Sequence, residues 1–123
     1  MTSKEFRKKM ARKHGRGYKN ANQLTKAIID YLNFSGFFVW RNNTTGIYDL
    51  KKGIFRKNAG LNGVSDILGI EKETGRFIAI EVKFGKDKLS DAQKRFLTRI
   101  ANAGGYAITA RKLADVIDVI DDE

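Results

Sequence analysis

The sequence predicts an α/β fold, a mixed β-sheet flanked by helices in the order α-β-β-β-α-β, with one further helix at the C-terminus. Two apolar stretches, 64–70 and 76–84, are joined by a tight turn and therefore predict an antiparallel pair of strands. A helical pattern over about 91–102 connects the second of them to another strand, 106–110, and such a crossover predicts a parallel pair. Apolar residues at helical spacing near both ends predict the covering helices.

The first helix is expected at about 22–35. Asn22 is a favourable N-cap, and Gly36 is a typical stop signal. The apolar stripe of this helix consists of Leu24, Ala27, Ile28, Tyr31 and Leu32. The aromatic and β-branched residues at 37–40 predict the first strand.

Residues 47–62 carry a weak signal, which is compatible with either a short hairpin or an ordered loop. Downstream, the apolar run at 77–80 has no polar face and predicts a strand buried inside the sheet. Glu81 and Lys83 end this strand, and because side chains alternate they project from the same face.

The second helix begins with a capping box, in which Ser90 is the N-cap and Gln93 is the third helical residue. Phe96, Leu97 and Ile100 are expected to face the core. The last helix is amphipathic, with an acidic outer face and an apolar face made of Leu113, Val116, Ile117 and Ile120.

The composition is that of one domain of 123 residues without cysteine, so neither a disulfide framework nor a thiolate metal site is expected. An apolar run of transmembrane length is missing as well, and we expect a protein of the cytoplasm, in a bacterial or phage-infected cell.

The net charge of +10 is concentrated at the N-terminus. Residues 1–20 hold eight basic residues and one acid, which gives +7 and leaves +3 for the remainder. We expect 1–20 to be a flexible basic arm and 21–123 to be a single domain. Nucleic acid is the favoured partner of such an arm and a membrane surface is disfavoured, while a merely solubilising tail stays the alternative.

Three charged residues are expected to meet at one end of the sheet. A turn near Thr74 pairs residues whose numbers sum to about 147–148, which places Asp66 beside Glu81 with Lys83 just beyond. Two adjacent carboxylates repel each other unless a cation lies between them. Oxygen ligands of this kind suit Mg²⁺ or Mn²⁺, and the chemistry indicated is metal-assisted hydrolysis of a phosphodiester.

The pattern Asp66…Glu81-Val82-Lys83 resembles the PD-(D/E)xK nuclease signature, and the predicted element order resembles the restriction-endonuclease-like core of that superfamily. Four segments, GVSDILG, GRFIAIEVK, KLSDAQKRFL and GGYA, resemble the VRR-NUC (virus-type replication-repair nuclease) family over about residues 22–110. The resemblance implies that Asp66, Glu81 and the main-chain carbonyl of Val82 bind the metal. It also implies that Lys83 is catalytic and that Gln93 lies near the site.

The small stand-alone members of this family resemble Holliday-junction resolvases that act as homodimers. The resemblance therefore implies a DNA endonuclease that acts on four-way junctions. Two residues depart from the pattern. Ser65 replaces the proline of the motif, and Gln23 stands about where many relatives have a glutamate that adds an acid to the metal site.

Seven basic residues are candidates for contact with nucleic acid: Lys86, Lys88, Lys51, Lys52, Arg56, Lys57 and Arg41. Lys86 and Lys88 belong to the loop after Lys83, where a solvated loop would have the same composition. Those near 47–57 alternate with aromatic residues, which is equally typical of a half-buried edge hairpin.

Simpler explanations exist for each site residue taken alone. Asp66 could cap backbone amides, Glu81 and Lys83 could form a surface salt bridge, and Gln93 is explained by the capping box. His14, the only histidine, is assigned no role. A non-catalytic nucleic-acid-binding module is the alternative function, and a protein-partner domain that uses the acidic last helix is the second.

Overall fold

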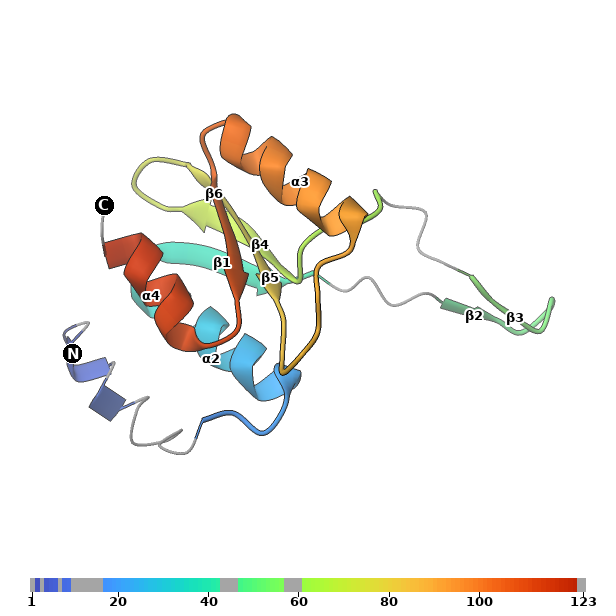
Figure 1. The fold of residues 1–123 in the computed structure, drawn as a ribbon, viewed down its shortest axis with the longest axis horizontal. Coiled ribbons are helices and arrows are strands. Elements are labelled where there is room, and N and C mark those ends of the chain that lie inside the picture. Colours follow the sequence, from blue (N-terminus) through green and yellow to red (C-terminus); the bar gives the residue numbers. More distant parts are fainter. Residues whose placement is uncertain are drawn as a thin grey trace.

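The computed structural model confirms a mixed four-stranded sheet with helices on both faces (Figure 1). It describes residues 2, 4–6, 8–9, 17–42, 47–56 and 61–121. The strands lie in the order β1-β4-β5-β6, and their bounds are Phe37–Arg41, Ile67–Glu71, Phe77–Val82 and Tyr106–Ala110. As predicted, β4 and β5 are antiparallel and β5 and β6 are parallel.

The first long helix, α2 (Ala21–Phe34), begins one residue earlier than the predicted range of about 22–35, and its N-cap lies two residues earlier than predicted. Its N-cap is Asn20 and not Asn22, because Asn20 has an extended backbone and its Oδ1 accepts a hydrogen bond from Gln23 N at 2.9 Å. Gly36, with φ of 93°, lets the chain leave the helix and enter β1 directly.

Residues 47–56 form a hairpin. Its strands are β2 (Ile47–Asp49) and β3 (Ile54–Arg56), and they make a separate two-stranded sheet. Of the two alternatives left open for this region, a short hairpin or an ordered loop, the hairpin is the one observed at 47–56. Figure 1 shows the hairpin apart from the four-stranded sheet.

Helices cover both faces of the sheet. α3 (Asp91–Asn102) has the predicted bounds and packs on β5 and β6, while α4 (Leu113–Asp121) packs on β6 and against α2 (Figure 1). Alternate residues of β5 separate the two layers. Ile78, Ile80 and Val82 join the core beneath α2 and α4. The intervening Ala79 and Glu81 face α3, where Gln93 contacts Glu81.

The register of β4 and β5 agrees with the sequence-based expectation. Ile67 pairs with Ile80 and Leu68 with Ala79, so that paired residue numbers sum to 147. Both strands are shorter than the predicted ranges 64–70 and 76–84. Asp66 therefore lies directly before β4 and not inside it.

Described N-terminal residues contact the domain, and both Phe6 and Tyr18 pack against the core. The ring of Phe6 stacks on Phe34, with centroids 4.7 Å apart and planes 11° apart, and lies 5.9 Å from Tyr31. The division into an arm of residues 1–20 and a domain of 21–123 stays a prediction. Across the described ranges, no helix is long and apolar enough to cross a membrane.

The close approach of β1 and β4 gives a stability prediction. A Cβ at Gly69 would lie 2.2 Å from Phe38 O and 2.7 Å from Val39 Cα, both of them backbone atoms. Gly69→Ala should therefore lower the free energy of unfolding by roughly 3 kcal/mol, as measured by urea unfolding. The control is Gly75→Ala, where φ is positive (76°), unlike at Gly69, and nothing lies within 4 Å. It should cost only about 1 kcal/mol. Equal costs for the two variants would contradict steric exclusion at Gly69.

Candidate active site

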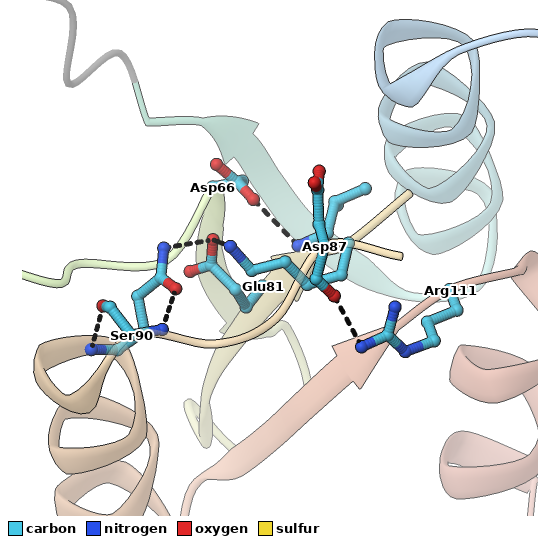
Figure 2. Close-up of polar contacts among 8 residues, drawn as sticks. Asp66, Glu81, Asp87, Ser90 and Arg111 are labelled. Atoms are coloured by element: carbon cyan, nitrogen blue, oxygen red, sulfur yellow. Dashed lines mark hydrogen bonds and ion pairs between the residues drawn. The ribbon is translucent and has the colours of Figure 1, made fainter. Parts of the chain in front are cut away.

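Asp66 and Glu81 lie side by side at one end of the sheet. The pairing of Ile67 with Ile80 places the next pair, Asp66 and Glu81, on neighbouring strands and on the same face. Asp66 Oδ2 accepts a hydrogen bond from Val82 N at 2.8 Å (Figure 2). Asp66 thus does cap a backbone amide, and it does so next to a second carboxyl group.

Glu81 is a buried carboxyl group with one unused oxygen. The residue is only 2% exposed. Its Oε1 accepts a hydrogen bond from Gln93 Nε2 at 3.0 Å, whereas Oε2 has no hydrogen-bond donor in the described part of the chain. A surface salt bridge is therefore the wrong description of Glu81. A buried oxygen without a donor is costly unless a proton or a cation occupies it.

The surroundings of Glu81 disfavour its ionised form. The pKa of Glu81 is raised to about 8, first by burial and then by Asp66, which can share a hydrogen bond with Glu81 only while one of the two carboxyl groups is protonated and whose charge opposes ionisation. Lys83 has the opposite effect on the pKa. A divalent cation at the site would favour the ionised form, because an opposite charge nearby stabilises a carboxylate.

Lys83 follows β5 and is largely buried. Its Nζ lies 4.0 Å from Glu81 Oε1, and its side chain is 14% exposed. The main-chain N–H of Lys83 donates to Ala110 O at 2.9 Å, which ties the residue to the end of β6. The ammonium group therefore stays beside the carboxyl pair, as predicted.

Gln93 has two partners at the start of α3. Its Oε1 accepts from Ser90 N at 2.8 Å and completes the predicted capping box, and its Nε2 donates to Glu81 (Figure 2). The capping box is therefore confirmed, and Gln93 lies beside Glu81, while its role in catalysis stays a prediction. One side chain joins the helix start to the buried carboxyl group.

Gly63 packs against the same helical turn. A Cβ at this position would lie 2.4 Å from the carbonyl carbon of Ala92, and Gly63 has φ of 79°. Only glycine fits here without a shift. The loop that leads to Asp66 is thus held against the residue before Gln93, a contact that the sequence did not suggest.

The donor set fits a hard divalent cation. Mg²⁺ is commonly bound by one or two carboxylates and keeps positions for water and phosphate oxygens. The Val82 N–H points toward Asp66, and the N–H and C=O of one residue in an extended strand point to the same edge, so the Val82 carbonyl faces the same side. Among the described residues no cluster of three or more His, Cys, Asp or Glu gathers, which leaves the two carboxyl groups as the acidic ligands.

Gln23 has a local role in α2. Its Oε1 accepts a hydrogen bond from Lys19 N at 3.0 Å, while its own N–H donates to the N-cap Asn20. The amide oxygen that replaces the expected extra acid is therefore used to close the first turn of the helix.

The predicted nucleic-acid contacts fall into three places. Lys86 and Lys88 are exposed on the loop between β5 and α3, and Arg41 is exposed at the end of β1, where its NH2 donates to Asn22 Oδ1 at 2.7 Å. Lys51 and Lys52 are exposed in the turn of the β2–β3 hairpin. Arg56 belongs to β3, and Lys57 lies outside the described residues.

Arg111 supports the loop between β5 and α3, which carries Lys86 and Lys88. The sequence alone did not point to this residue. Its guanidinium donates to Gly85 O at 3.1 Å. It also donates to Asp87 O at 2.7 Å (Figure 2). The residue directly follows β6, the parallel neighbour of β5. Because the carboxyl ends of parallel strands meet at one edge, this position was the available signal.

Comparison with known proteins agrees with this geometry. The model of the VRR-NUC domain matches residues 39–112, which is more than half of the chain and includes Asp66, Glu81, Lys83 and Gln93. The chain belongs to the VRR-NUC family. This is a family of nucleases, and the mixed sheet with flanking helices agrees with a restriction-endonuclease-like fold. None of the curated proteins compared with this VRR-NUC domain matches it.

The raised pKa of Glu81 predicts how stability depends on pH. Between about 4.5 and about 8 the folded protein keeps a proton that the unfolded chain has lost, so the free energy of unfolding should fall as pH rises through this range. The loss is at most about 1.4 kcal/mol per pH unit. Urea unfolding in a chelator should show this slope in the wild type, and Glu81→Gln should flatten it.

Glu73→Gln is the control for this pH dependence. Glu73 lies exposed in the turn between β4 and β5, so its replacement should leave the slope unchanged. A Glu81→Gln protein that retains the wild-type slope would contradict the proton assignment.

Gln93→Glu separates the two contacts of Gln93. A glutamate can still accept from Ser90 N, but it cannot donate to Glu81 Oε1 when ionised. The metal-free variant should lose about 1–3 kcal/mol of unfolding free energy near pH 9 and less near pH 6, where Glu81 carries a proton. Ser90→Ala removes only the cap and should cost about 1 kcal/mol at both pH values. A pH-independent loss in Gln93→Glu would contradict the Glu81 contact.

Proposed function

We propose that this VRR-NUC domain is a divalent-metal-dependent endonuclease that hydrolyses DNA phosphodiester bonds at branched structures such as four-way junctions. The observation that carries the proposal is the buried Glu81 Oε2 without a hydrogen-bond donor, which lies beside Asp66 and close to Lys83. A buried carboxyl oxygen of this kind suits a cation better than it suits a purely structural role.

Asp66, Glu81 and the carbonyl of Val82 would hold Mg²⁺ or Mn²⁺. When bound, the ion would lower the pKa of water and neutralise negative charge on the phosphate. Gln93 keeps Glu81 Oε1 in place, so that Oε2 stays directed to the site. The hydrogen bond from Val82 N holds the Asp66 carboxyl group in the same way.

Lys83 is proposed to act on the reacting groups. Its ammonium group, fixed beside Glu81, would donate a hydrogen bond that orients the attacking water. Alternatively, it would neutralise negative charge that develops on the phosphate. Lysine suits this task because it is a compact point charge on a flexible stem.

The basic surface is proposed to bind the DNA backbone. Lys86 and Lys88 lie on a loop that Arg111 holds next to the site. Their ammonium groups would therefore contact the phosphates nearest to the cleaved bond. The remaining proposed contacts are Arg41, Lys51, Lys52, Arg56 and Lys57. Phosphate neutralisation by such residues makes affinity fall steeply with salt.

A homodimer that acts in the cytoplasm completes the proposal. Symmetric cleavage of two strands requires two sites related by a two-fold axis, which a C₂ dimer supplies. Sedimentation with and without junction DNA tests the dimer, and a monomer under both conditions would contradict junction resolution while leaving single-strand nicking possible.

The cleavage experiment compares four proteins on junction and duplex DNA with Mg²⁺ or Mn²⁺. Glu81→Gln and Lys83→Ala should each reduce cleavage by at least roughly 100-fold while binding measured in a chelator is retained. Lys26→Ala is the matched control. Lys26 is an exposed lysine paired with Asp30 on α2 and should cleave like the wild type. Tight DNA binding by the wild type without any cleavage would favour the non-catalytic module instead.

A further inference from the structure

In the described part of the chain, α3 is the helix on the face of the sheet that carries Glu81, and it covers two of the four strands. α3 packs on β5 and β6, and the strands β4 and β1 continue the sheet beyond it. Phe38 is 55% exposed and Trp40 is 44% exposed, whereas Phe37 and Val39 between and beside them are buried in the core under α2. Since side chains alternate along β1, Phe38 and Trp40 belong to the face opposite α2.

The register places these aromatic residues on the same face as the carboxyl pair. Trp40 pairs with Leu68, and Leu68 pairs with Ala79, so these three form one row across β1, β4 and β5. Asp66 and Glu81 form the next row on that face. The rows are one two-residue step apart, about 7 Å along the strands. Trp40 is therefore a near neighbour of the proposed metal site.

The two rings present a continuous aromatic surface, with centroids 5.5 Å apart and planes 52° apart. Such large apolar side chains are costly to leave in water, and a patch next to a site is typical of a binding surface. Aromatic rings, unlike aliphatic side chains, accept the flat faces of nucleobases.

Positive charge borders this surface on the α3 side. Arg95 and Arg99 line a hollow together with Leu61, Asn62, Ala92 and Phe96, which places both arginines on the side of α3 that faces the loop leading into β4. The opposite side of α3, with Lys94, Leu97 and Thr98, faces β6. Both arginines therefore lie on the side of α3 that faces away from β6, beside the segment that leads into β4.

We propose that Phe38 and Trp40 are a stacking platform for unpaired bases next to the bond that is cut, with Arg95 and Arg99 contacting the adjoining phosphates. The location of the cut bond rests on the proposed nuclease function. The substrate class is then DNA with a single-stranded or unpaired segment beside the cleavage site. Stacking of this kind tolerates any base, because every base has a π-face.

A second copy of this chain is a less favourable occupant of the platform. Two copies of a chain with a net charge of +10 repel each other, and Arg95 and Arg99 add positive charge on the α3 side of this face. The same charges attract a phosphate backbone.

The test uses Trp40 as its own reporter, because it is the only tryptophan in the chain. A short oligothymidylate, titrated in a chelator, should change Trp40 fluorescence more strongly and at lower concentration than a duplex of equal length. Phe38→Ala should weaken oligothymidylate affinity by roughly 5- to 100-fold. Arg95→Ala with Arg99→Ala should weaken it as well and reduce its salt dependence.

Val119→Ala is the matched control. Val119 is an apolar residue of similar exposure, 39%, on α4, and its truncation should leave oligothymidylate affinity unchanged. Unaltered Trp40 fluorescence on titration, or equal affinities of Phe38→Ala and the wild type, would overturn the platform. So would a Phe38→Ala protein that only loses a dimer in sedimentation and binds oligothymidylate normally.

The platform and the nuclease can fail separately. If no DNA is cleaved but oligothymidylate still quenches Trp40 in a Phe38-dependent way, the platform stands and the nuclease function does not. If cleavage depends on Glu81 and Lys83 but Phe38→Ala and Trp40→Ala cut substrates with unpaired segments at the wild-type rate, the platform is wrong and the nuclease stands.

Discussion

The pairing of β4 with β5 is the constraint on which the candidate site depends. Because paired residue numbers sum to 147, Asp66 is carried beside Glu81, whose carboxyl group is buried beneath α3. A slip of one residue would turn Asp66 toward the opposite face of the sheet. The same pairing buries Ile67, Ile78 and Ile80, so the hydrophobic core and the site require one register.

Burial of Glu81 makes the ionised form of its carboxyl group unfavourable unless a cation is bound. Its Oε1 is satisfied by Gln93, while Oε2 has no donor among the described residues, and the pKa of the group rises to about 8. Without a metal ion, the folded domain is therefore more stable when Glu81 is protonated. A bound divalent ion would instead favour the ionised form of Glu81. A buried polar group without a partner is typical of functional sites, where catalysis or binding requires an arrangement that is unfavourable for stability.

The site is also supported from outside the sheet. Gly63 holds the loop before Asp66 against α3, and Arg111 holds the loop after Lys83 through two main-chain carbonyls. Both loops thus depend on elements distant in the chain. The aromatic surface of Phe38 and Trp40 continues from the carboxyl row across β4 to β1, so the site and the strands that continue the sheet beyond α3 form one face.

The sequence by itself determined the element order, the bounds of α3 and β6, the capping box, and the meeting of Asp66 with Glu81, because short-range spacing and a tight turn decide these features. It did not determine that Glu81 is buried, that Gln93 contacts it, or that Arg111 and Gly63 support the loops. Those contacts join residues that are distant in the chain, and they arise only when α3 packs on the sheet and β6 pairs with β5. The N-cap of α2 was misplaced at Asn22, because two neighbouring asparagines have the same propensity and only the backbone conformation at Asn20 decides between them.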